Sequence, residues 1–227
     1  LNHLNEVHRH IITIEDPIEY RLDGIIQGNV NTAAGLTFAR GLRAMLRADP
    51  DVILVGESRD PETAGTAIEA ALTGHLVLTS LHANDAAGAV VRLVEMGVEP
   101  FLVGSSVTCS VAQRLVRKVC SKCRESYSPE PELLEKLGLP LHHDYVKGRG
   151  CEFCSESGYK GRCGIYEVMK ITPQIRKLIY ANAPGSEIAE RARKDGMECL
   201  RDDALTKVLS GVTTVDEVIR VSPEEAA

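Results

Sequence analysis

The chain has 227 residues, of which 44% are hydrophobic, so it contains enough apolar sequence to bury a substantial core. Its formal net charge is −6 and only 4% of its residues are aromatic, which argues against a broad basic surface or a base-stacking platform for nucleic acid. It has neither a run of about eighteen apolar residues nor a signal-peptide pattern. We therefore expect a soluble, cytosolic chain with no direct nucleic-acid partner.

The N-terminal part of the chain predicts a strand and then a helix. Residues Ile11–Glu15 form a short apolar run that ends in acids before Pro17, a pattern typical of a buried strand followed by a turn. Thr37 is a good N-cap for the segment that follows it. This segment places its apolar and its basic residues on two different helical faces. The apolar face has Phe38, Leu42, Met45 and Leu46, and the basic face has Arg40, Arg43 and Arg47.

Strands and helices alternate through the next seventy or so residues. Val52–Val55 is a continuous apolar strand, and Asp60 with Pro61 predicts the start of a helix that ends before Gly74. The remaining predicted elements are a strand over His75–Leu81 and helices over about Ala86–Met96 and Pro100–Val119. Such alternation favours an α/β fold with a mainly parallel sheet.

The character of the sequence changes after Cys120. Prolines, glycines and paired cysteines predict a small loop-rich module, and the chain from Ile171 onward predicts helices. The expected helix signals are Thr172 and Ser186 as caps, Gly211 as a stop, and Thr214 with Glu217 as a capping box. We predict three parts: an α/β core over 1–119, a tetracysteine module over 120–163 and a helical subdomain over 164–227.

Acidic residues follow two of the predicted strands. Glu15 and Asp16 follow the first, and Glu57 follows Val52–Val55. Carboxylates at the ends of buried parallel strands are well placed to hold a magnesium ion or its water during phosphoryl transfer. Taken singly, each acid could equally cap a helix or solvate a turn.

Four of the seven cysteines form two C-x-x-C pairs, Cys120 with Cys123 and Cys151 with Cys154. Two such pairs can offer four thiolates to one tetrahedral ion, which favours a structural zinc site over a redox role. Three further residues are weaker competing ligands: Cys163, His142 and His143. The other two cysteines, Cys109 and Cys199, are expected to be buried small hydrophobic residues.

Three stretches carry a close resemblance to a known family: Thr13–Glu19, Asp49–Glu57 and Thr73–His82. Gly35–Arg40 and Ala112–Arg117 match it as well. The chain resembles the secretion ATPase superfamily of type II secretion and type IV pilus assembly, in the GspE/PulE/PilB branch, from about Ile11 to Val221. Ser58 departs from the apolar residue usual in the family at this position.

The resemblance implies a RecA-like core that binds ATP with Mg²⁺, in a motor that drives type II secretion or type IV pilus assembly. It implies an Asp box at Glu15–Glu19, a Walker B segment at Ile53–Glu57 and a His box at His75–His82. Glu57 would act on magnesium and the attacking water, with Glu15 as a second candidate base, and His82 would contact the γ-phosphate with support from His75. Asp16, Glu19 and Arg59 are further nucleotide-site candidates.

The family resemblance also implies a homo-hexameric ring, peripheral at the inner membrane, that acts on an inner-membrane platform protein. In such a ring Arg40, Arg43 and Arg47 are candidates for charge stabilisation in the transition state, although a helix face with three arginines is usually a solvated face.

No phosphate-binding string of the form G-x-x-x-x-G-K-[ST] occurs in the sequence. We therefore expect the sheet to lack its first βα unit and this chain alone to bind and hydrolyse nucleotide very weakly.

Two readings of a different class stay open at this point. One is a zinc-dependent interaction module, resembling a nucleic-acid-binding zinc ribbon, which the negative charge and low aromatic content disfavour. The other is a metal-dependent hydrolase that uses Glu15, Asp16, Glu57 and His82 without a nucleotide.

Overall fold

The computed structural model describes residues 1–221, which form two compact units. The first comprises Leu1–Ser110 with Lys170–Asp195, and the second comprises Val111–Met169 with the chain from Gly196 onward. The three-part division expected from the sequence stays a prediction. Within residues 1–221, no helix is both long enough and apolar enough to cross a membrane.

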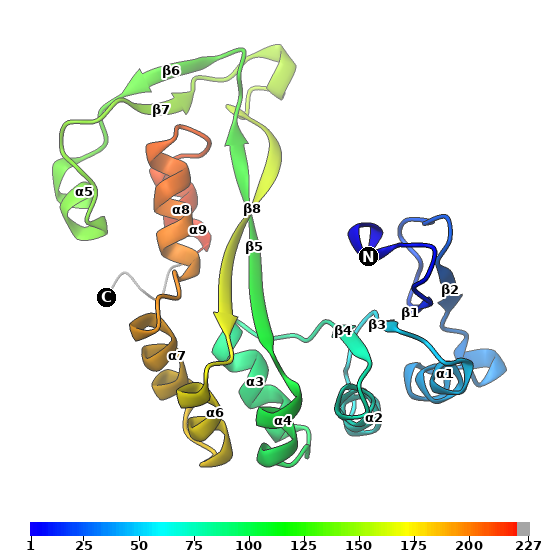
Figure 1. Ribbon diagram of the computed structural model, residues 1–227. Helices are drawn as coiled ribbons and strands as arrows, with labels where there is room; N and C mark the ends of the chain where they lie inside the picture. Colours follow the sequence, from blue (N-terminus) through cyan, green and yellow to red (C-terminus); the bar gives the residue numbers. More distant parts are fainter. Residues whose placement is uncertain (222–227) are drawn as a thin grey trace. The chain divides into compact units, whose positions relative to one another are not determined.

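The first unit contains a four-stranded parallel sheet in the order β2-β1-β3-β4 (Figure 1). Its strands are β1 Ile11–Glu15, β2 Ile26–Asn29, β3 Val52–Val55 and β4 Leu76–Thr79. The sequence predicted β1 and β3 with these bounds and β4 with a few more residues, but it did not predict β2. In the register of the sheet, Val55 of β3 lies between Ile14 of β1 and Thr79 of β4, so the strands end at one common edge.

Helices α1 (Phe38–Met45) and α2 (Pro61–Leu72) pack against each other and cover one face of this sheet (Figure 1). The shared core consists of Ile12, Ile14, Leu42, Met45, Ile53, Val55, Ala67 and Ala70. Both predicted N-caps are confirmed, because the side chain of Thr37 accepts from Arg40 N and that of Asp60 accepts from Thr63 N. The alternation of strand and helix thus gives the α/β fold that the sequence indicated.

Four more helices belong to the first unit. They are α3 Ala86–Glu95, α4 Pro100–Ser106, α6 Pro173–Tyr180 and α7 Gly185–Lys194, and short 3₁₀ turns occur at Asn2–Leu4, Thr32–Ala34 and Leu46–Ala48. Thr172 caps α6 as predicted, through a hydrogen bond from Ile175 N. The expected cap Ser186 is wrong, since α7 begins at Gly185 with Pro184 as its N-cap residue, and Ser186 already lies inside the first turn.

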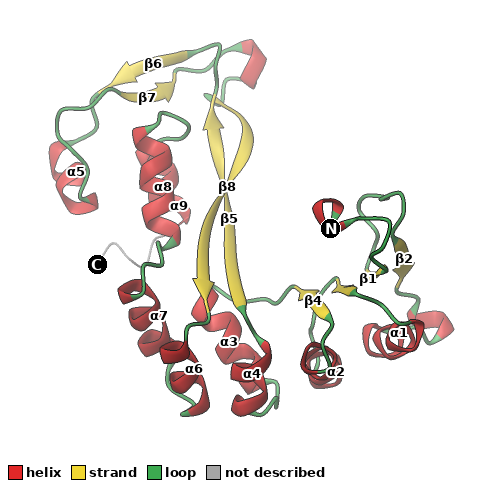
Figure 2. Cartoon of the chain, in the orientation of Figure 1, coloured by secondary structure: helices red, strands yellow, loops and turns green. Residues whose placement is uncertain are grey.

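The second unit is built around two long strands, β5 (Cys109–Val119) and β8 (Tyr159–Lys170), which pair with each other (Figure 2). A second two-stranded sheet and three helices complete it, together with a 3₁₀ turn at Glu152–Cys154. These elements are β6 Arg124–Tyr127, β7 Tyr145–Gly148, α5 Pro131–Leu137, α8 Leu200–Leu209 and α9 Val215–Val221.

The predicted helix over Pro100–Val119 is wrong in its second half. Helix α4 ends at Ser106, and the chain continues as strand β5. Residues from Cys109 to Leu115 alternate between more and less exposed positions, which is the period of a strand. Pairing with β8, far away in the sequence, therefore overrides the local helical pattern. Cys109 is exposed rather than buried, whereas Cys199 is buried as expected.

A buried carboxylate ties α9 to β5. Glu217 has no exposed side-chain surface, and its two oxygens accept hydrogen bonds from the backbone N–H and guanidinium of Arg117 at 2.6–2.8 Å. The Arg220 guanidinium donates to the same carboxylate at 2.8 Å. Thr214 accepts from Glu217 N, so one half of the predicted capping box is present. The Arg117 guanidinium also lies 4.1 Å from the centre of the Tyr159 ring of β8, which joins three elements.

Burial opposes ionisation of Glu217, but the hydrogen bonds from Arg220 and Arg117 outweigh it and lower the pKa of the carboxyl to about 2, from an ordinary value of 4.5. A carboxylate with a lowered pKa stabilises the folded state above its unfolded pKa, and this contribution is lost as pH falls through the folded pKa. We therefore expect Glu217→Gln to reduce the free energy of unfolding of the second unit by about 2 kcal/mol at neutral pH.

The difference in free energy of unfolding between Glu217→Gln and the wild type should shrink as pH falls from about 4.5 towards about 2. Amide hydrogen exchange of α9 and β5 measures it locally, and Glu132→Gln, a change to an exposed acid on α5 in the same unit, serves as the matched control. Equal effects of the two substitutions at neutral pH would contradict a stabilising role for Glu217.

Candidate functional site

Three of the predicted acidic and histidine segments meet at the carboxyl edge of the parallel sheet. Strands β1, β3 and β4 are adjacent, and Glu15, Glu57 and His82 lie at or just beyond their carboxyl ends. The backbone holds the first two segments together, because Gly56 N donates to Ile14 O at 2.8 Å. Gly56 also lies close to the backbone of β1, since a Cβ on Gly56 would be 3.3 Å from Cα of Glu15. The fold thus brings these segments, distant in sequence, to one edge.

Glu57 is largely enclosed, with 14% of its side chain exposed. Its Oε2 lies 2.5 Å from Arg59 Nε and 3.6 Å from His82 Nε2. Carboxylate, guanidinium and imidazole therefore form one group, in which Arg59 and His82 remain largely exposed. Such a group can bind a cation through Glu57 or exchange a proton between carboxylate and imidazole.

Glu15 lies at the end of the neighbouring strand, but its carboxylate has other partners. Its Oε1 accepts hydrogen bonds from Thr13 Oγ1 at 2.5 Å and from Gln27 Nε2 of β2 at 3.0 Å. Asp16 and Glu19 are exposed in the loop that follows β1. The structure thus places Glu15 at the same edge as Glu57 but directs its carboxylate towards β2, and Asp16 and Glu19 follow in the exposed loop.

His75 stands apart from this group. It precedes β4, whereas His82 follows it, so the two histidines of the predicted His box lie beyond opposite ends of one strand. The Nδ1 atom of His75 is 2.9 Å from Ala70 O and 3.1 Å from Thr73 Oγ1, at the C-terminal end of α2. These contacts fasten the helix to the strand, and they do not join His75 to His82.

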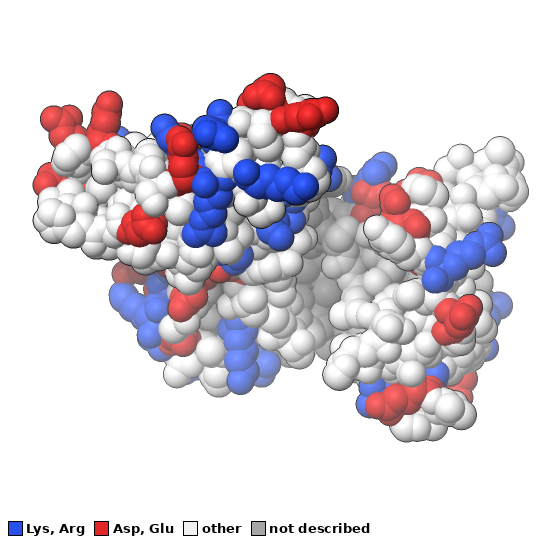
Figure 3. All heavy atoms as spheres, turned by 90° about the horizontal axis from the view of Figure 1, so that it is seen from above, with Lys and Arg blue, Asp and Glu red and all other residues white. Residues whose placement is uncertain are grey.

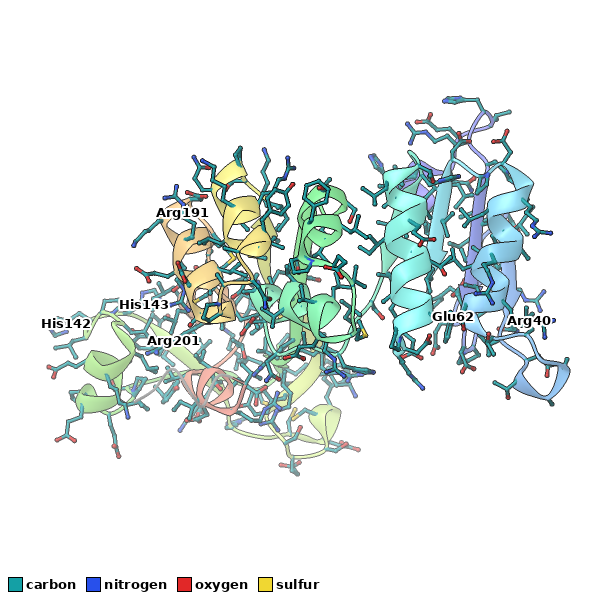
Figure 4. All side chains as sticks on the ribbon, turned by 90° about the horizontal axis from the view of Figure 1, so that it is seen from below. Arg40, Glu62, His142, His143, Arg191 and Arg201 are labelled. Carbon is teal, nitrogen blue, oxygen red and sulfur yellow. The ribbon has the colours of Figure 1, made fainter. Side chains whose placement is uncertain are left out.

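Two of the three candidate arginines have local partners. Arg40 donates to Gly35 O at 2.9 Å, and Arg43 forms an ion pair with Glu62 of α2. Figure 4 shows Arg40 on α1 and Glu62 on the neighbouring α2. Arg47 lies in the 3₁₀ turn after α1 and is exposed. Arg40 and Arg43 thus have partners within the first unit, on the elements next to α1.

Sequence reasoning missed the hydroxyl groups around the Glu57 segment. Ser58 is buried, and its Oγ lies 3.0 Å from Oγ1 of Thr79 at the end of β4. Ser80 Oγ donates to Gly56 O at 2.6 Å. The only sequence signal was the placement of these hydroxyls directly after two apolar strands, and nothing in the sequence shows that the strands are neighbours.

The four paired cysteines converge in the second unit. Their Sγ atoms all lie within 4.8 Å of one another. Within residues 1–221, this is the one group of cysteines close enough together to hold a metal ion. Separations of 3.9 Å (Cys120–Cys151), 3.8 Å (Cys123–Cys154) and 3.7 Å (Cys151–Cys154) are too long for a disulfide. They match the spacing of about 3.8 Å between ligands of a tetrahedral zinc ion with bonds of about 2.3 Å.

The backbone around these cysteines favours thiolates. Burial opposes ionisation of Cys154, but the N–H groups of Cys151 and Gly158 donate to its Sγ at 3.3 Å and lower the pKa of the thiol to about 6. Burial and, to a smaller extent, the neighbouring thiols raise the pKa of Cys123 to about 12. Four close thiols cannot all ionise without a cation, so the cluster fits a divalent metal.

The competing metal ligands lie elsewhere. His142 and His143 follow α5 (Figure 4), and His143 Nε2 lies 2.9 Å from Leu209 O. Cys163 packs against the apolar core of the second unit rather than against the other cysteines. The structure therefore assembles the four residues that the C-x-x-C spacing indicated.

Comparison with known proteins identifies the family. The family described as "Type II/IV secretion system protein" matches residues 1–220. The chain is 53% identical over 211 residues to the type IV pilus assembly ATPase PilB of Thermus thermophilus, covering 91% of this chain and 24% of that protein. It is 50% identical over 230 residues to type II secretion system protein E of Pseudomonas aeruginosa, covering 99% of this chain and 45% of that protein.

Among solved structures, that of the pilus retraction motor PilT with bound ADP matches with a TM-score of 0.71 and 28% identity, covering 98% of this chain and 55% of that one. The chain spans less than half the length of the two curated relatives just named. The family match covers nearly all of the sequence, and the parallel sheet agrees with the solved relative. The chain therefore belongs to the Type II/IV secretion system protein family.

Proposed function

We propose that this chain is the larger part of an ATP-hydrolysing motor domain that powers type II protein secretion or type IV pilus assembly. The observation that carries the proposal is the group of Glu57, Arg59 and His82 at the carboxyl edge of a parallel sheet, in a chain of this family. Relatives at about half identity are a pilus assembly ATPase and a type II secretion protein. The sheet would be RecA-like, with its phosphate-binding βα unit supplied by the full-length protein.

In this proposal Glu57 orients the attacking water and accepts its proton. The nearly buried position of its carboxylate at the end of a rigid strand restricts the directions from which water and a cation can approach it. Bound Mg²⁺ with ATP would supply the electrophilic phosphorus and neutralise charge on the phosphates. His82 Nε2, close to the Glu57 carboxylate, would face the γ-phosphate, and Glu15, Asp16 and Glu19 would line the same edge.

Positive charge at the reaction centre would come from arginines. Arg59 already contacts Glu57, whereas Arg40, Arg43 and Arg47 on and after α1 would serve a neighbouring subunit in a homo-hexameric ring. The ring would act on an inner-membrane platform protein. We do not propose a nucleic-acid partner, since acidic and basic side chains are intermixed on the face shown in Figure 3 and the net charge is −6.

A substitution of Glu57 tests the assignment in the full-length protein. Glu57→Gln keeps the shape of the side chain but removes its charge and basicity, so ATP turnover should fall by about a hundredfold or more while ATP binding persists. Phosphate release and binding of a fluorescent nucleotide measure the two properties.

Glu69→Gln, the same change at an exposed position on α2, is the matched control and should retain turnover. A Glu57→Gln protein with normal turnover would remove Glu57 from the chemistry and leave the proposed function without its site.

The cysteine cluster would hold one structural zinc ion that fixes the loops between β5 and β8. The backbones of Gly148 and Gly158 approach so closely there that neither position has room for a Cβ. A structural zinc contributes roughly 10–16 kcal/mol of apparent binding free energy to a module of this kind. The four thiolates complete the coordination of the ion, so the role is structural rather than catalytic.

Elemental analysis should find about one zinc per chain, and Cys154→Ser should lower that value and increase hydrogen exchange in β6 and β7. Cys109→Ser, which changes an exposed cysteine outside the cluster, should retain the metal. A purified protein that contains no metal and keeps the same exchange protection would show that the cluster folds without zinc.

A further inference from the structure

Three hydrogen bonds join the turn after β3 to the end of β4. Ser58 N donates to Ser80 O at 2.9 Å, and Ser80 Oγ donates back to Gly56 O at 2.6 Å. Ser58 Oγ and Thr79 Oγ1 lie 3.0 Å apart. Regular pairing of the two strands ends at Val55 and Thr79, so these bonds continue the connection where the strand ladder stops.

The two ends of this connection hold Glu57 and His82, two of the three members of the proposed catalytic group. Glu57 lies between Gly56 and Ser58, both of which are bonded to Ser80, the residue after β4, and His82 follows Ser80 by two residues. The contact of 3.6 Å between Glu57 Oε2 and His82 Nε2 thus spans two segments that Ser80 fastens together. Ser80 is bonded to the residues on both sides of Glu57: its hydroxyl donates to Gly56 O, and its carbonyl accepts from Ser58 N.

The surroundings leave the Glu57 turn little freedom to move in another direction. Gly56 is bonded to Ile14 O on its other side and lies against the backbone of Glu15. Ser58 is only 4% exposed, so water does not readily replace its hydrogen bonds. A shift of the Glu57 turn would therefore have to break its hydrogen bonds to Thr79 and Ser80.

We propose that Ser80, with Ser58 as its partner, is a positioning residue that sets the geometry between Glu57 and His82. The inference rests on the proposed function, because it assigns Ser80 a role through Glu57 and none in direct contact with the nucleotide. Loss of the Ser80 hydroxyl frees one side of the Glu57 turn, and small misplacements of a catalytic group reduce rate more than they reduce binding.

The experiment measures ATP turnover of the full-length protein with Ser80→Ala and with the conservative variant Ser80→Thr. Ser80→Ala should lower kcat by about five- to tenfold with KM for ATP changed by less than about twofold, and Ser80→Thr should restore most of the loss. The pH profile of kcat should also shift in Ser80→Ala, because the substitution moves the Glu57 carboxylate relative to the His82 imidazole.

Thr213→Val is the matched control for loss of a hydroxyl that supports the fold. Thr213 is buried in the second unit, where its Oγ1 donates to Arg117 O at 2.8 Å. Its substitution should lower thermal stability and leave kcat and the pH profile unchanged. Ser58→Ala provides a second test at the other end of the connection, and its loss in kcat should not add to that of Ser80→Ala.

The outcomes separate the two proposals. If Glu57→Gln keeps normal turnover, the proposed function fails, whatever Ser80 does. If Glu57→Gln abolishes turnover but Ser80→Ala and Ser58→Ala both retain wild-type kcat and pH profile, the positioning role is overturned and the function stands. If Ser80→Ala does not fold, Ser58→Ala alone decides: an unchanged kcat overturns the inference, and a loss with unchanged KM supports it.

Discussion

Parallel pairing of β1, β3 and β4 is the constraint on which the first unit depends. Because the three strands run in the same direction, their carboxyl ends share one edge, and the polar residues that follow them must lie close together. The apolar residues of β1 and β3 are buried against α1 and α2, and Val77 of β4 packs against the same core, which fixes the edge in place. Glu57 gains a nearly enclosed position beside His82 from an arrangement that hydrophobic burial stabilises.

The second unit uses different means to hold its shape. Its loops around the cysteines contain little apolar side chain, and four thiols within 4.8 Å of one another take the place of a core. Farther along the same strands, the Glu217 carboxylate binds Arg117 and Arg220 and so closes α9 onto β5. The cysteine cluster and the Glu217 carboxylate both place charged or metal-binding atoms in buried positions, where an unpaired group would destabilise the fold. Removing one partner should therefore cost more than the pair itself contributes.

The two units contain separate candidate sites. The proposed reaction group depends on hydrogen bonds between strand ends, and a change of a few tenths of an ångström there alters the separation of Glu57 and His82. The second unit has its own core and its own candidate metal. Family membership and the similarity to pilus and secretion ATPases support the reaction group that we propose for the first unit.

The sequence by itself determined β1, β3, the α/β class, the caps of α1, α2 and α6, and the four cysteines, because these follow from local patterns of polarity and spacing. It failed where distant segments decide the structure: β5 is a strand because β8 pairs with it, although its local pattern suggested a helix. The roles of Glu217, His75 and Ser80 in the fold also escaped it. Each has a partner more than three residues away, and only the tertiary structure brings such partners into contact.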